Sequence, residues 1–232
     1  MSYNYKMIIA YDGARYQGWQ INKNAKETIQ GKLEYIIGEI TGQEISVIGS
    51  GRTDKGVHAE GQIANFETEQ PQDIDVFLSQ INEKLPEDII VRSLEIADER
   101  FNARLTAVDK TYRYTLWKAD SVSLPLFERK YVYKLDDKMN IDNMRFGAAK
   151  FIGKHDFKGF SSDKTKKSTE RTINSIEIVE DENTIVILIN GTGFLYNMVR
   201  IIVGTLIEIG RNERQAETID QIFQEKVREK AG

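Results

Sequence analysis

A glycine-rich loop at residues 49–59, Gly-Ser-Gly-Arg-Thr-Asp-Lys-Gly-Val-His-Ala, carries the most informative chemistry in the sequence. Asp54 supplies a carboxylate that can attack an electrophilic carbon and leave again. Arg52 and Lys55 place positive charge beside it, which favours the ionised carboxylate and attracts phosphate. The glycines permit positive φ angles and close approach of a ligand to the backbone. The loop therefore predicts a nucleophile site beside an anionic substrate.

The same loop has a simpler interpretation, in which Asp54-Lys55-Gly56 forms a tight turn and Arg52 pairs with Asp54 on the surface. Common phosphate-binding patterns do not fit the loop. G-x-x-x-x-G-K-S/T fails because Val57 follows Gly56, and G-x-G-x-x-G fails because Asp54 stands at the third glycine position. From the residue types alone, the nucleophile site and the surface turn both remain open.

The composition narrows the chemistry further, because the 232 residues include no cysteine and only two histidines, His58 and His155. Disulfides, thiolate metal sites and cysteine nucleophiles are excluded. A zinc site would have to be built mostly from carboxylates, and no G-x-S-x-G segment accompanies either histidine. An enzyme without a cofactor or metal is favoured, if the chain is an enzyme. Since no apolar run approaches the roughly 18 residues of a membrane span, and the N-terminus lacks an apolar signal-peptide core, we expect a cytoplasmic protein.

Charge is distributed unevenly along the chain. The formal net charge is −4, but residues 100–171 carry a net charge of +8 and the remainder −12. A basic middle segment can present a positive face to nucleic acid, whereas a surface this charged also forms patches by chance. The Lys164–Ser168 run, Lys-Thr-Lys-Lys-Ser, is first interpreted as a surface loop and second as a contact for RNA phosphates.

The first half alternates strand and helix patterns. Strands are predicted at 5–11, 45–48, 62–68 and 89–96, and helices at 28–40 and 74–85. Thr28 is expected to cap the first helix, and Pro86 to stop the second. The resulting order, β-α-β-β-α-β, predicts a ferredoxin-like arrangement with the Asp54 loop between its second and third strands.

The second half, residues 101–232, repeats this order loosely, which divides the chain at residues 1–100 and 101–232. Strands are predicted at 111–117, 173–179 and 185–189, with an extra one at 131–133, and helices at 141–151, 195–209 and 216–227. A second β-α-β-β-α-β unit needs a strand after its last helix, and none is evident. Either residues 131–133 supply that strand or the chain is cut short.

Several blocks of residues together resemble one family. The loop at 51–59 resembles the signature loop of the TruA family of tRNA pseudouridine synthases, which more often has alanine at position 55. Three further blocks are similar to the family's motifs and follow its order: Tyr11-Asp12-Gly13 with Tyr16 and Gly18-Trp19-Gln20; Phe101–Arg104 with Lys110–Tyr114; and Gly193–Arg200 with Val203-Gly204. Residues 167–173 match more weakly. Together these blocks are highly specific.

The resemblance implies an isomerase, an intramolecular transferase that converts uridine to pseudouridine at positions 38, 39 and 40, in the anticodon stem-loop of tRNA. No cofactor or metal is required. The implied fold is α+β, with two ferredoxin-like halves whose antiparallel sheets join around a central RNA-binding cleft. The implied partners are tRNA and a second copy of the chain in a homodimer, with no membrane. Family members usually continue into a closing strand, so we expect the chain to be truncated.

The resemblance also implies roles for individual residues. Asp54 would be the essential catalytic residue, by attack at C1′, attack at C6 or proton abstraction from the ribose. Tyr112 corresponds to the active-site tyrosine and would stack on the uracil, although a tyrosine near Tyr114 on a strand also suits core packing. Arg200 matches the active-site arginine and is expected to pair with Asp54, although it could be a charge on a helix surface.

The remaining candidates are expected to contact RNA or to support the loop. Arg52 would help to displace the target nucleotide from its stack. The expected phosphate contacts are Lys55, Arg104, Lys110, Arg113 and the loop at 164–167. His58 is expected to be a structural hydrogen-bonding residue. Two rival functions remain, a non-catalytic RNA-binding protein and a nucleotide-phosphate hydrolase that uses the glycine-rich loop.

Overall fold

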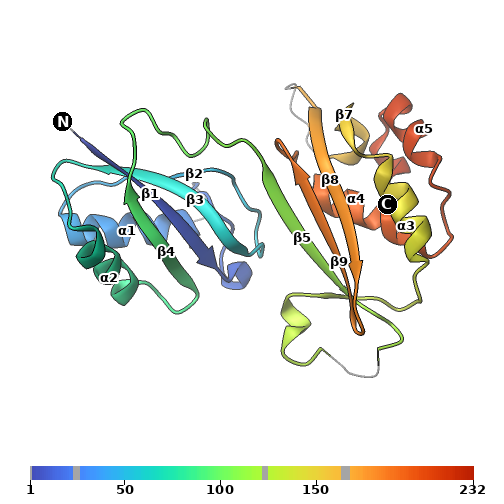
Figure 1. Cartoon of the computed structure of the whole chain (residues 1–232), viewed down its shortest axis with the longest axis horizontal. Helices are drawn as coiled ribbons and strands as arrows, with labels where there is room; N and C mark the ends of the chain where they lie inside the picture. Colours follow the sequence, from blue (N-terminus) through green and yellow to red (C-terminus); the bar gives the residue numbers. More distant parts are fainter. Residues whose placement is uncertain (1, 23–26, 122–124, 163–167) are drawn as a thin grey trace. The chain divides into compact units, whose positions relative to one another are not determined.

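The computed structural model describes residues 2–22, 27–121, 125–162 and 168–232, which form an α+β fold with two sheets (Figure 1). The chain divides into two compact units, Met1–Ala107 and Val108–Gly232. Each unit has its own hydrophobic core. The lysine-rich loop at 164–167, predicted to contact RNA, lies outside the described residues. Within the described ranges, no helix has the length and apolar character needed to span a bilayer.

The first unit contains a four-stranded antiparallel sheet. Its elements are β1 (Tyr3–Tyr11), α1 (Ile29–Thr41), β2 (Ile48–Gly49), β3 (Ala59–Thr68), α2 (Ile74–Lys84) and β4 (Ile89–Ile96), with a 3-10 turn at Gly13–Arg15. The strand order is β2-β3-β1-β4. Alternate residues of β1 are buried, as expected for a strand with one covered face: Tyr5, Met7, Ile9 and Tyr11. Figure 1 shows α1 and α2 on the same side of this sheet.

Helix α1 begins and ends with the signals that the sequence carries. The Thr28 hydroxyl oxygen accepts a hydrogen bond from Gly31 N at 3.1 Å, so the predicted N-cap is confirmed. Such a cap is worth about 1 kcal/mol. The helix ends at Gly42, whose φ of 70° is a left-handed conformation that glycine adopts without strain. Helix α2 ends at Lys84, two residues before Pro86.

Strand β2 is shorter than the predicted strand at 45–48. Ile45 and Val47 are buried, as their apolar character suggested. The backbone of Val47, however, bonds to side chains of α1: Val47 N donates to Glu34 Oε1 at 2.9 Å, and Gln30 Nε2 donates to Val47 O at 3.1 Å. Because helix side chains satisfy these backbone groups, only Ile48 and Gly49 pair with β3.

The second unit contains a five-stranded mixed sheet. Its elements are β5 (Lys110–Trp117), β6 (Tyr133–Lys134), α3 (Ile141–Ala149), β7 (Gly153–Asp156), β8 (Glu170–Glu180), β9 (Thr184–Gly191), α4 (Met198–Gly210) and α5 (Thr218–Glu225), with 3-10 turns at Glu128–Lys130, Phe157–Phe160 and Arg228–Lys230. The strand order is β6-β5-β9-β8-β7, in which only β5 and β6 are parallel. Residues from the sheet and the helices share one core.

Besides shifts of two or three residues at the ends of α3, α5 and β8, three differences from the sequence prediction stand out in this unit. Strand β7 was not predicted, because Gly-Lys-His-Asp has no apolar alternation, and it exists through pairing with β8. Helix α4 begins at Met198, not at 195, because Asn197 has a left-handed backbone with φ of 59°. The extra strand lies at Tyr133–Lys134 and pairs at the edge of the sheet with β5. Up to residue 232, no strand follows α4 among the described residues.

Candidate active site

The Asp54 loop connects β2 to β3 in the first unit. The side chains of Arg52, Asp54 and Lys55 are exposed, whereas the residues around them are half-buried. Val57 N donates to Asp54 O at 3.1 Å, and Gly56 has a φ of 77°, so the chain turns sharply directly after the carboxylate. The predicted tight turn is thus present, and it leaves the Asp54 carboxylate accessible to a substrate.

The residues before this turn are held from inside the unit. The Tyr11 hydroxyl lies 2.8 Å from Thr53 Oγ1 and donates to Gln62 Oε1 at 2.9 Å. Gln62 Nε2 donates to Gly51 O at 3.1 Å. Trp19 N donates to Thr53 O at 3.0 Å. The backbone on the N-terminal side of Asp54 is therefore fixed at residues 51 and 53.

Two glycines of the N-terminal segment lie directly against the loop. A Cβ on Gly13 would stand 2.0 Å from Val57 O, and a Cβ on Gly18 would stand 2.8 Å from Thr53 O. Gly18 also has a φ of 106°, which side-chain-bearing residues rarely adopt. The block at residues 11–20 thus supports the Asp54 loop. In the sequence this block stands out only as a motif, and its glycines at 13 and 18 are the signal of close approach.

His58 joins the end of the loop to the same N-terminal segment. Its Nδ1 atom lies 3.1 Å from Gly13 N and 2.9 Å from Asp12 Oδ1. Asp12 Oδ1 also accepts from Ala14 N at 2.9 Å. These contacts agree with the structural, hydrogen-bonding role that was predicted for His58.

Arg104 belongs to the same unit as Arg52. The segment after β4 returns to the first sheet, where Asn4 Nδ2 donates to Phe101 O at 2.8 Å and Ala103 N donates to Asn65 Oδ1 at 2.9 Å. Partial desolvation and the positive charge of Arg104 both lower the pKa of the Arg52 guanidinium. Within the described ranges, no ion pair within 4.0 Å involves Arg52 or Arg104. Two neighbouring guanidinium groups without carboxylate partners favour binding of an anion such as a phosphate.

In the second unit, Tyr112 lies on β5 and is half-buried. Its ring contacts Phe194 edge to face, with 5.0 Å between the ring centroids and 87° between the planes. Phe194 is carried by the turn between β9 and α4. A Cβ on Gly191 would stand 2.7 Å from Thr172 O and 3.2 Å from Phe194 Cζ, so glycine is needed for this turn to close. Phe194 belongs to one of the motifs in the sequence, but its contact with Tyr112 was not predicted.

Arg200 is exposed on the first turn of α4. Burial raises the pKa of the Tyr114 hydroxyl, and the charge of Arg200 acts in the opposite direction, which places the two groups within electrostatic reach. Tyr112 and Tyr114 lie on the same face of β5, and Arg113 lies on the other face. Lys110, at the start of β5, is half-exposed. The second unit therefore gathers Tyr112, Tyr114 and Arg200, but not Arg113.

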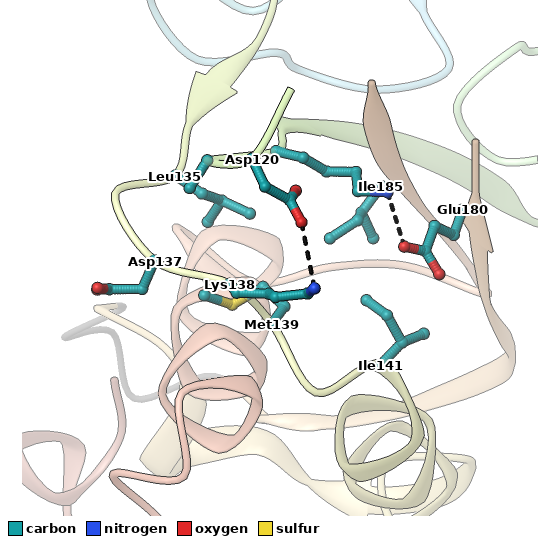
Figure 2. Close-up of a pocket in the computed structure, with 10 residues that line it drawn as sticks. Asp120, Leu135, Asp137, Lys138, Met139, Ile141, Glu180 and Ile185 are labelled. Atoms are coloured by element: carbon teal, nitrogen blue, oxygen red, sulfur yellow. Dashed lines mark ion pairs between the residues drawn. The ribbon is translucent and has the colours of Figure 1, made fainter. Parts of the chain in front are cut away.

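A cavity of about 140 Å³ in the second unit contains none of the predicted site residues (Figure 2). Four of its charged residues form two ion pairs: Lys118 Nζ lies 2.8 Å from Glu180 Oε1, and Lys138 Nζ lies 3.5 Å from Asp120 Oδ2. Lys118 directly follows β5 and lies about 20 Å from Tyr112, at the usual rise of a strand. The cavity is therefore separate from Tyr112.

The fold and the site define the class of protein. It is an α+β protein with an exposed carboxylate, Asp54, on a hydrogen-bonded basic loop, and its second unit carries a cluster of Tyr112, Tyr114 and Arg200. The model of the tRNA pseudouridine synthase family matches residues 7–104 and 148–232, and the chain belongs to this family. Arg52, Asp54, Lys55, Arg104 and Arg200 lie within the matched residues. The stretch between them, which holds Lys110, Tyr112 and Arg113, is not matched by the family model.

Individual relatives cover nearly the whole chain. A protein named tRNA pseudouridine synthase A from Bacillus sp. strain KSM-64 is 46% identical over 230 residues, which are 99% of this chain and 93% of the relative. tRNA pseudouridine synthase A 1 of Clostridium tetani is 44% identical over 226 residues, 97% of this chain and 91% of the relative. tRNA pseudouridine synthase A of Acetivibrio thermocellus is 42% identical over 230 residues, 99% and 93% respectively. The predicted family and activity are confirmed: the chain is an isomerase that converts uridine to pseudouridine in tRNA.

Proposed function

We propose that the chain modifies uridines of the anticodon stem-loop, at positions 38, 39 and 40 of tRNA, with Asp54 as the catalytic residue. In this reaction the N1–C1′ bond breaks, the uracil turns, a C5–C1′ bond forms, and C5 loses a proton while N1 gains one. Attack at C1′, attack at C6 and abstraction of a ribose proton all need a carboxylate in one fixed place. The observation that carries the proposal is that Asp54 is exposed on a loop whose backbone is fixed at residues 51 and 53.

Tyr112 and Arg200 are proposed to act on the same uridine as Asp54. The Tyr112 ring stacks on the extruded uracil, and its hydroxyl takes part in removal of the C5 proton. The resemblance implies that Arg200 pairs with the Asp54 carboxylate. Support comes from the resemblance and from the second unit, where Phe194 holds the Tyr112 ring and Arg200 lies within electrostatic reach of the neighbouring Tyr114.

The basic candidates are proposed to hold the RNA backbone. Arg52 displaces the target nucleotide from its stack, and Lys55, Arg104, Lys110 and Arg113 contact phosphates. The guanidinium groups of Arg52 and Arg104, near one another and without an ion pair in the described ranges, support this role. Affinity for tRNA should therefore fall as salt concentration rises.

We also propose that the two units, which the sequence divided at residues 100 and 101 and the structure divides at Ala107 and Val108, are ferredoxin-like halves of one cytoplasmic homodimer subunit. The order β2-β3-β1-β4 in the first unit and the order β5-β9-β8 in the second support the repeated arrangement. A single chain has a net charge of −4. A dimer would bring the basic residues of two chains to one tRNA. Light scattering of the purified chain tests the dimer directly: a monomeric mass at micromolar concentration would refute it.

The test of catalysis is tritium release from tRNA that carries tritium at C5 of its uridines. Wild-type protein should release tritium, Asp54→Asn should not, and the matched control Asp75→Asn, an exposed aspartate of α2, should behave as wild type. Filter binding should show that Asp54→Asn still holds tRNA. Mapping of the product should locate pseudouridine at positions 38, 39 or 40.

Two other results would replace the proposal by its rivals. Binding of tRNA without tritium release by the wild type would indicate a non-catalytic RNA-binding protein. Release of phosphate from ATP or GTP in the absence of RNA would indicate a hydrolase that uses the glycine-rich loop.

A further inference from the structure

A directional chain of hydrogen bonds runs beneath the Asp54 loop. Tyr11 has one hydroxyl proton, which it donates to Gln62 Oε1 at 2.9 Å, so the Thr53 hydroxyl, 2.8 Å away, donates to the Tyr11 oxygen. Gln62 then donates through Nε2 to Gly51 O at 3.1 Å. Tyr11 is thereby linked to the loop twice, at residue 51 directly before Arg52 and at residue 53 directly before Asp54.

A register shift in the first sheet brings the members of this series of hydrogen bonds together. The pairing of β1 with β3 changes register between Ile9, opposite Gln62, and Tyr11, opposite Ala59, so β3 contains one more residue than β1 in this interval. A bulge of this kind redirects side chains at a strand end. Tyr11 is buried with 5% of its surface exposed, on the same side of β1 as the core residues Met7 and Ile9. Its hydroxyl nevertheless reaches the loop.

We propose that Tyr11 is a positioning residue for the isomerisation, acting on the Asp54 carboxylate through Thr53 and Gln62. This inference rests on the proposed role of Asp54. An exposed carboxylate on a loop with glycines at 49, 51 and 56 has no rigid strand or helix of its own to fix it. The hydroxyl group of Tyr11, a residue with 5% of its surface exposed, helps to fix the loop together with the backbone bond from Trp19 N to Thr53 O. Displacement of a catalytic group by about 1 Å can reduce a rate about 100-fold.

Tyr11→Phe separates this role from ordinary core packing. The variant keeps the ring that packs beside Trp19, at 6.2 Å between centroids, and removes only the hydroxyl group. Tyr5→Phe is the matched control: Tyr5 lies on the same strand, is fully buried, and its hydroxyl accepts one hydrogen bond from Gln72 N at 2.8 Å. The two variants make the same chemical change at different places along β1.

Thr53, the loop residue that bonds to Tyr11, provides a second pair of variants. Thr53→Val removes the hydroxyl that bonds to Tyr11 and keeps the shape of the side chain, whereas Thr53→Ser keeps the hydroxyl. If Tyr11 acts through Thr53, the valine variant should lose activity as Tyr11→Phe does, and the serine variant should retain it. The double variant Tyr11→Phe/Thr53→Val should be no slower than Tyr11→Phe alone, because Tyr11→Phe already breaks the link to Thr53.

The experiment measures kcat and KM for tritium release from labelled tRNA, with thermal unfolding of each variant. Tyr11→Phe and Thr53→Val should lower kcat about 10- to 100-fold and leave KM within about twofold, because the position of a catalytic group affects the chemical step and not the binding of tRNA. Tyr5→Phe and Thr53→Ser should keep kcat within about twofold of wild type.

Three results would overturn the inference. These are a wild-type kcat for Tyr11→Phe, an equal loss of kcat in Tyr5→Phe, or a loss of kcat in Thr53→Ser as large as that in Thr53→Val. An active Asp54→Asn variant would instead refute the proposed function, so the two failures are distinguishable.

Discussion

The glycine at position 18 offers a sharp test of how the loop is supported. Gly18 combines a φ of 106° with a Cβ position only 2.8 Å from Thr53 O. Gly42 provides the matched control, because it also has a positive φ, 70°, but has no atom within 4 Å of its Cβ position. Gly18→Ala therefore introduces backbone strain and a collision with the Asp54 loop, whereas Gly42→Ala introduces backbone strain alone.

The size of each effect follows from this geometry. Backbone strain from alanine in the left-handed region costs about 1–2 kcal/mol, which is the whole effect expected for Gly42→Ala. At Gly18 the strain costs about 1–3 kcal/mol, since its φ lies further from the left-handed minimum. Ordinary contact begins at 3.4 Å, so the Thr53 carbonyl must also move. Movement of a few tenths of an ångström to 1 Å at the residue before Asp54 should lower kcat by about 10- to 100-fold.

The assay combines denaturant unfolding with kinetics of tritium release. Both alanine variants should have lower unfolding midpoints than wild type, and only Gly18→Ala should have a lower kcat. A wild-type kcat for Gly18→Ala, with the predicted loss of stability present, would show that the loop does not depend on the N-terminal segment. An equal loss of kcat in Gly42→Ala would show that general destabilisation is responsible.

Two further predictions concern charge. Arg52→Gln and Arg104→Gln should each weaken tRNA binding and reduce the slope of log affinity against log salt by about 0.7–0.9, whereas Lys84→Gln, at an ammonium group that already has a carboxylate partner, should leave the slope unchanged; equal slopes in all three variants would contradict a phosphate contact. Hydrogen bonds from Thr184 and from backbone amides lower the pKa of Asp181, so this group adds stability above its ordinary pKa that is lost as the pH falls through the folded value. Thermal unfolding from pH 6 to pH 2 should show a smaller acid-induced loss in Asp181→Asn than in wild type, and identical acid profiles would refute this assignment.

The sequence predicted elements best where backbone signals and apolar spacing agree. Thr28 and the apolar face that follows it predicted a helix at 28–40, which is within one residue of α1 at each end. The pattern was less informative where side chains replace strand pairing, as at Val47, whose backbone bonds to Gln30 and Glu34. It failed at β7, which exists because β8 offers a partner and not because its own residues favour a strand.

The residue types of the candidate site could be identified from the sequence, but the contacts that hold these residues in place could not. Asp54 and its charged neighbours were evident from one loop. The contact of Tyr112 with Phe194, by contrast, joins residues 82 positions apart and depends on how the turn after β9 closes. Arg104 was assigned to the second half by sequence, yet the hydrogen bonds of Asn4 and Asn65 hold its segment on the first sheet. Local patterns carry no information about such distant pairings.

The shortness of the outer strands has a consequence for the behaviour of the protein at high concentration. In the described part of the chain, three of the four edge strands of the two sheets are short. Strands β2 and β6 have two residues each, and β7 has four. Each of these short strands presents few amides and carbonyls of its own to a further strand. The fourth edge, β4, has eight residues, but Arg92 and Glu95 interrupt its exposed positions with charge. Short length and interspersed charge in these edge strands are features that discourage amyloid-like growth.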